Sequence, residues 1–197
     1  MRKYVVAAAV VLLLAGCVRT LHPLYTKKDL TFDPALVGVW EPRDPDKKER
    51  WDFRKAGEKS YKLIHTDEND RKVKLEAHLV ELGEYRFLDL NTDEPEESNA
   101  LQSLLLQPVH MFMKVESIEP RLKLVVMNPQ WLGDHLEEHP DALKTEDPED
   151  APAVVTASTK DLQKFVLKHA DNDKAWGKPI EFLRVKQEKQ GPANIEE

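Results

Sequence analysis

Apolar and polar side chains alternate along most of the chain between residues 36 and 127, in short runs separated by polar turns. In the clearest run, Val73, Leu75, Ala77 and Leu79 alternate with charged or polar neighbours. A period of two residues is typical of a β-strand with one buried face. The same pattern predicts strands at 36–40, 50–54, 61–65, 85–90, 110–118 and 122–127, while an apolar stretch at 101–106 stays unassigned.

Two segments after residue 127 have helical periodicity instead. Asn128 followed by Pro129 is a favourable helix start, and apolar residues recur at helical spacing until Pro140. A second helix is predicted to begin at Ser158 or Thr159, and residues 180–185 are predicted to form the last strand.

The resulting order predicts a mainly β fold with minor α content. About eight strands follow one another as an antiparallel meander, with two short helices inserted before the last strand. A meander of this length removes its exposed edges by closing into a barrel.

The first residues of the chain have the features of a secretory signal peptide. Two basic residues precede an apolar run at 4–14, which is too short to cross a bilayer because a helical span needs about 20 residues. The run ends in Leu14-Ala15-Gly16-Cys17, which resembles the lipobox of bacterial lipoproteins. The resemblance implies that signal peptidase II cleaves between Gly16 and Cys17, and that the thiol of Cys17 carries a diacylglycerol.

These features divide the chain into a signal peptide at 1–16, a lipidated cysteine with a tether and docking segment at 17–35, a single β-rich domain at 36–186 and a loose polar tail at 187–197. Acyl chains on Cys17 are then the membrane contact, because each buried methylene contributes about 0.8 kcal/mol. The domain is expected outside the cytoplasm. In a cell with two membranes, Val18 in place of an aspartate favours the periplasmic face of the outer membrane.

Gly38-Val39-Trp40 resembles the first-strand Gly-x-Trp of lipocalins and of lipocalin-like lipoproteins. In those families an arginine of the last strand packs over the tryptophan at the closed end of the barrel. The resemblance implies that Arg184 is this arginine and that Trp40 and Arg184 form a structural pair, since a guanidinium stacked on an indole contributes about 1 kcal/mol when desolvated.

Composition narrows the possible partners. The formal net charge of −7 argues against nucleic acid, which needs a basic patch, and against electrostatic adhesion to anionic lipid. Cys17 is the only cysteine in the sequence, which excludes an intramolecular disulfide. Once Cys17 is acylated, the domain has no thiol chemistry.

The run from His135 to His139, with Glu138 before the second histidine, fits the H-x-x-E-H pattern of inverted zinc peptidases. Histidines at i and i+4 face the same way on a helix, as two-point zinc ligation requires. Pro140 follows directly, however, and places His139 in the terminal turn. We therefore expect no catalytic constellation and no cofactor, and keep His135 and His139 as the candidate metal ligands.

Three functions are compatible with these observations. The first is a non-enzymatic, lipid-anchored cell-envelope lipoprotein that binds a small apolar ligand. The second is a structural or assembly lipoprotein that docks an envelope protein. The third is a zinc metallopeptidase acting through His135 and His139. An apolar space above Trp40 would favour the first, and a filled barrel with an exposed apolar patch on the helices would favour the second.

The lipobox generates a direct prediction. Cys17→Ser in the full-length precursor removes the thiol that would carry the acyl chains, so the protein is expected to move from the membrane fraction to the soluble fraction. Cell fractionation with metabolic fatty-acid labelling measures this. Unchanged membrane retention would contradict the lipoprotein interpretation.

Overall fold

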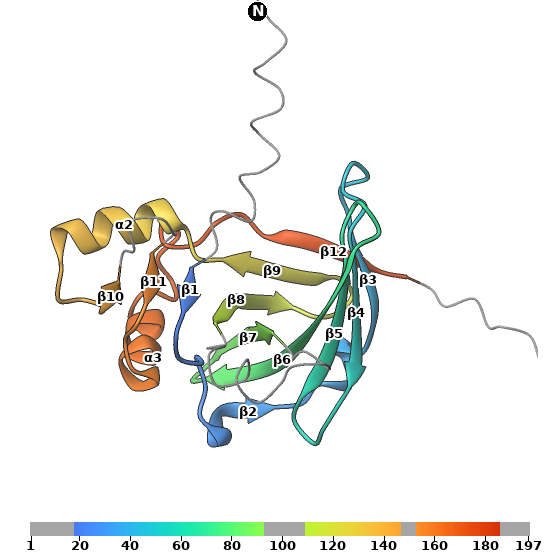
Figure 1. Cartoon of the computed structure of the whole chain (residues 1–197), viewed down its shortest axis with the longest axis horizontal. Helices are drawn as coiled ribbons and strands as arrows, with labels where there is room; N and C mark the ends of the chain where they lie inside the picture. Colours follow the sequence, from blue (N-terminus) through green and yellow to red (C-terminus); the bar gives the residue numbers. More distant parts are fainter. Residues whose placement is uncertain (1–17, 93–108, 147–152, 186–197) are drawn as a thin grey trace, which may run out of the picture.

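The computed structural model describes residues 18–92, 109–146 and 153–185. Eight antiparallel strands close into a barrel in the order β3, β4, β5, β6, β7, β8, β9, β12, with β12 paired to both β9 and β3 (Figure 1). The strands are β3 (Gly38–Pro42), β4 (Arg50–Lys55), β5 (Tyr61–Thr66), β6 (Lys72–Leu82), β7 (Tyr85–Thr92), β8 (His110–Ser117), β9 (Leu122–Val126) and β12 (Ile180–Arg184). The predicted mainly β, lipocalin-like fold is confirmed.

Both predicted helices lie between β9 and β12. Helix α2 (Pro129–Glu138) begins after Asn128, whose side chain accepts from the backbone of the first turn, and α3 (Thr159–Lys168) begins after Ser158, which does the same. Figure 1 shows α2 and α3 on one side of the barrel.

Short elements that the sequence pattern did not predict complete the fold. They are the strands β1 (Arg19–Thr20), β2 (Leu30–Thr31), β10 (Thr145–Glu146) and β11 (Val154–Val155) and the 3₁₀ turns η2 (Lys27–Asp29) and η3 (Pro34–Leu36). A strand of two residues is too short to establish a period of two. The unassigned stretch at 101–106 lies outside the described residues.

The barrel wall separates two apolar cores. Inside the barrel the largest side chains are fully buried: Trp40, Phe53, Tyr61, Leu63, Leu79, Leu88, Leu122, Leu124 and Phe182. The second core lies on the outer face of β6 to β9, where α2 and α3 cover it, and includes Val80, Phe87, Phe112, Val125, Leu132, Leu162, Phe165, Val166 and Trp176. The interior of an eight-stranded barrel is just wide enough for side chains to fill.

Trp40 and Arg184 close one end of the barrel. Arg184, the last residue of β12, is in register with Trp40 of β3, and its guanidinium carbon lies 4.4 Å from the centre of the indole ring. The guanidinium donates hydrogen bonds to the carbonyl oxygens of Ala35 and Val37, and Trp40 Nε1 donates to Leu36 O at 2.9 Å. The contact that the lipocalin resemblance implies is therefore present.

The first described residues contact the barrel. Residues 18–31, which we call the strap, are packed on it: β1 pairs with β8 and β11, β2 pairs with β6, and Leu24 is fully buried. The strap thus lies against the barrel from Val18 onward. The predicted signal peptide, Cys17 and the polar tail lie outside the described residues. Within the described ranges, no helix is long and apolar enough to cross a membrane.

Gly38 explains the first position of the Gly-x-Trp pattern. Its φ is +139°, a conformation that residues with a Cβ rarely adopt, and a Cβ added there would lie 2.6 Å from Arg184 Nη1. The close approach of Arg184 to the start of β3 therefore requires glycine.

Gly38→Ala is expected to lower the free energy of unfolding by about 2 kcal/mol, because it strains the backbone and displaces Arg184. Gly133→Ala is the matched control. It lies in α2 with open space around it and is expected to stabilise by about 0.5–1 kcal/mol. Urea unfolding followed by tryptophan fluorescence measures both, and equal effects would contradict the role of Gly38.

Candidate functional site

The end of the barrel opposite Arg184 has an apolar lining that is partly exposed. We call this end the mouth. Its apolar side chains come from five of the eight strands and lie near the strand ends: Trp51, Val73, Leu75, Met111, Val126 and Ile180. Val73 is 43 % exposed, and the other five are half-buried against the interior core. The mouth thus presents apolar surface that the barrel's own side chains do not fully cover.

Trp51 forms the floor of the mouth together with Phe182. Their ring centres lie 5.2 Å apart, and Phe53 lies 6.1 Å from Trp51. Below these rings the interior is filled by the core around Trp40. The partly exposed apolar surface of the barrel interior is therefore at the mouth rather than at the closed end.

A polar group borders the same surface. His65 packs edge-on against Trp51 at 5.6 Å, and its Nε2 lies 3.5 Å from Glu49 Oε2. The hydrogen bond to His65 holds the pKa of Glu49 below its ordinary value. The rim can therefore contact a polar or positively charged group beside an apolar body.

A second polar site, formed by Asp89 and His110, lies under the strap on the outer wall. Asp89 of β7 is fully buried, and its Oδ2 accepts a hydrogen bond from the backbone N–H of Leu24 at 2.8 Å. Its Oδ1 lies 2.7 Å from Nδ1 of His110 on β8, which is 8 % exposed. Asp–His pairs serve as general bases in enzymes. Here one oxygen of Asp89 holds the strap through Leu24 and the other is bonded to His110 of β8, so we assign the pair a structural role.

Tyr25 covers this pair from the strap side. Its ring lies 4.6 Å from His78 and 6.4 Å from His110. Burial, with a smaller effect of the Asp89 charge, raises the pKa of Tyr25 to about 12, so the phenol stays neutral. Burial also lowers the pKa of His78, although Glu76 lies nearby and favours its charged form.

Helix α3 holds the strap from the other side. Thr159 Oγ1 donates to Pro23 O at 2.8 Å, and Gln163 Nε2 donates to Leu24 O at 2.8 Å and to Asp29 Oδ2 at 2.9 Å. The strap is therefore fixed between the barrel wall and α3.

The candidate metal ligands His135 and His139 are brought together on α2, with ring centres 4.8 Å apart. His135 stacks on Trp131, with ring centres 4.9 Å apart and planes 14° apart, while His139 is exposed at the end of the helix. Among the residues that the structure describes, no group of three or more His, Cys, Asp or Glu side chains could hold a metal ion. The contacts of His135 are aromatic packing contacts.

Sequence reasoning did not select Asp89, His110 or His169. Asp89 stands between Leu88 and Leu90 on the outward face of its strand, a position expected to face water. The only sign in the sequence that Asp89 is buried was its position as a single carboxylate within an apolar run. The covering strap and α3 are far away in sequence, so the pattern alone could not show that this face is buried.

Comparison of the chain with protein families, with curated proteins and with solved structures finds no match. The function is therefore argued from the residues of this chain.

Asp89→Ala is expected to lower the free energy of unfolding by about 3 kcal/mol or more, because it leaves the N–H of Leu24 and the ring of His110 without their buried acceptor. Asp52→Ala removes a half-buried carboxylate that pairs at 2.6 Å with the exposed Arg54 and should cost less, about 1 kcal/mol. Urea unfolding compares the two variants. A similar, small loss in both would show that the buried pair does not hold the strap.

Proposed function

We propose that this protein is a non-enzymatic, lipid-anchored envelope lipoprotein that binds a small apolar ligand at the mouth of its barrel. The observation that carries the ligand proposal is the ring of partly exposed apolar side chains at the mouth, above a filled and closed interior. Exposed apolar surface that a rigid scaffold holds in place marks interaction sites, small-molecule sites among them.

The shape of the interior limits the ligand. Trp51 and Phe182 pack beside the buried core around Trp40, so the described side chains leave a long acyl chain no deep channel at that end. The ligand we propose has a compact apolar body that stacks on Trp51. A polar group on it would meet Glu49 and His65 at the rim.

The lipid anchor rests on Leu14-Ala15-Gly16-Cys17 and on the strap. Val18, the residue after Cys17, is 9 % exposed and belongs to the outer core. An acylated Cys17 would thus join the membrane directly to a clamped segment, and the barrel would sit close to the bilayer without a flexible spacer. With acyl chains as the attachment, the acidic domain needs no electrostatic affinity for lipid.

The two other hypotheses receive less support. Helices α2 and α3 turn Leu132, Phe165 and Val166 onto the barrel, which leaves less apolar surface for a docked protein. The histidines of α2 are packed against aromatic rings, which does not favour a peptidase.

Val73→Arg is expected to weaken binding at the mouth about tenfold or more, because it places a charge where an apolar ligand removes water, and each factor of ten corresponds to about 1.4 kcal/mol. The probe is the neutral apolar fluorophore N-phenyl-1-naphthylamine. Its binding is measured by its emission and by energy transfer from tryptophan.

Leu183→Arg is the matched control. The exposed fraction of Leu183 is 44 %, close to the 43 % of Val73. Leu183, however, lies on the outer face of β12, next to the inward-facing Phe182. This variant should bind the probe as the wild type does. Absence of saturable binding by the wild type, or equal weakening in both variants, would exclude the mouth as the site.

A further inference from the structure

Three histidines gather where α2 meets α3, and we call them the histidine cluster: His135, His139 and His169. The ring of His169, the residue that ends α3, lies 4.9 Å from that of His135. Trp131 contacts both rings, at 4.9 Å each, and Phe165 lies 4.7 Å from His169. The cluster thus lies in the contact between the two helices.

Two buried ring nitrogens in the cluster, Nε2 of His135 and Nε2 of His169, have no hydrogen-bond partner among the residues that the structure describes. His169 as a whole is 8 % exposed. A neutral imidazole can leave such a nitrogen as a bare acceptor, but a protonated ring carries N–H donors on both nitrogens. Protonation would therefore bury a charge and a donor with nothing to accept it.

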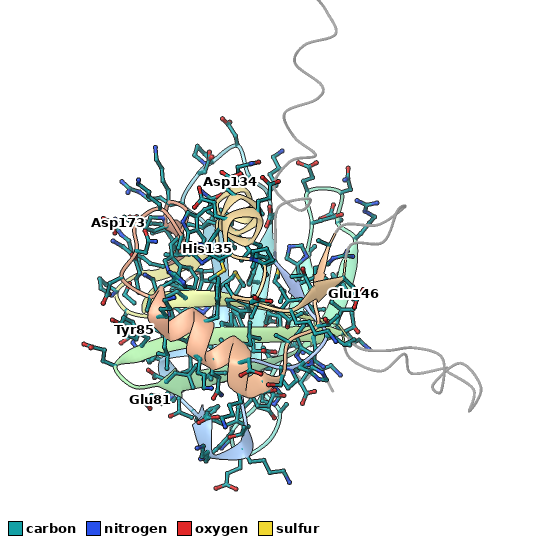
Figure 2. The ribbon with its side chains drawn as sticks, turned by 90° about the vertical axis from the view of Figure 1, so that its left-hand side faces the viewer. Glu81, Tyr85, Asp134, His135, Glu146 and Asp173 are labelled. Carbon is teal, nitrogen blue, oxygen red and sulfur yellow. The ribbon has the colours of Figure 1, made fainter. Side chains whose placement is uncertain are left out.

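The charged groups around the cluster do not offset this cost. Lys168 of α3 and the other histidines oppose protonation, whereas Glu138 of α2 favours it for His135. Glu138, Asp141 and Lys168 line a surface pocket together with His135 and His139. Figure 2 shows His135 on the inner side of α2 and Asp134 on its outer side, away from the cluster.

Acid is expected to destabilise the packing of α2 on α3. Burial, followed by the neighbouring histidine and Lys168, lowers the pKa of His135 and of His169 below the ordinary value of 6.5. Well above pH 6.5 both rings are mostly neutral whether the helices are packed or apart. As the pH falls below 6.5, separated rings take up protons more readily than packed rings, so acid favours separation.

We propose that the histidine cluster is an acid-sensitive clasp that holds α2 on α3 near neutral pH and releases α2 as the pH falls from 7 to 5. Release uncovers the apolar outer core beneath Leu132 of α2, a surface that is buried at neutral pH. The acid response of the clasp does not require the lipid anchor. Only the statement that the clasp meets the pH outside the cytoplasm rests on the proposed location of the protein.

Hydrogen exchange read by mass spectrometry tests the clasp in the mature chain, residues 17–197 with Cys17→Ser, which contains every described element. After correction for the intrinsic effect of pH, the amides of α2 should exchange about tenfold faster at pH 5.0 than at pH 7.5, while β6 should change less than about twofold. The double variant His135→Gln/His169→Gln lacks both of the rings whose protonation the proposal invokes and should lose the difference. His22→Gln, at an exposed histidine, should retain it.

A measurement on the unmodified side chains guards against a variant that fails to fold. In an NMR titration, His135 and His169 should take up protons below pH 6.5, and the amide signals of α2 should change with the same midpoint. The proposal is overturned if both rings titrate at or above 6.5, if α2 stays equally protected at both pH values, or if the folded double variant keeps the wild-type response.

Discussion

Closure of the barrel by its last strand is the constraint on which the rest of the structure depends. β12 pairs with β9 on one side and with β3 on the other, after the two helices have intervened. Without it, β3 and β9 would both be open edges with unpaired backbone groups. The register of β12 places Arg184 against Trp40, and that contact in turn requires glycine at position 38.

Closure also divides the apolar residues into two sets. The inward set fills the barrel and leaves partly exposed side chains at the mouth. The outward set on β6 to β9 would face water if the barrel stood alone, and it is covered by α2, α3 and the strap. Polar groups caught beneath this cover have to find partners there, which explains why Asp89 is bonded to the N–H of Leu24 and to His110. The cover thus depends on a few buried polar contacts, whereas the barrel depends on backbone pairing.

This division relates to the proposed function. The barrel is the rigid part, and its mouth is the surface we propose for a ligand. The cover contains the strap, which leads to Cys17, and the helix pair with its histidines. The proposed attachment to a membrane and the proposed response to acid both involve the cover, where α3 contacts the strap and α2.

The sequence by itself determined the strands, the two helices and their order, because alternation and capping act over a few residues and need no distant partner. The pairing of Trp40 with Arg184 came from a short motif and its resemblance to lipocalins. The burial of Asp89 and the meeting of His169 with His135 were decided by tertiary structure. A period of two shows which residues share a face but not what covers that face. Leu24, which covers Asp89, is 65 residues away in the sequence. His169 directly follows α3, whereas His135 is on α2. The lining of the mouth became visible only when eight strand ends were brought together in a closed barrel.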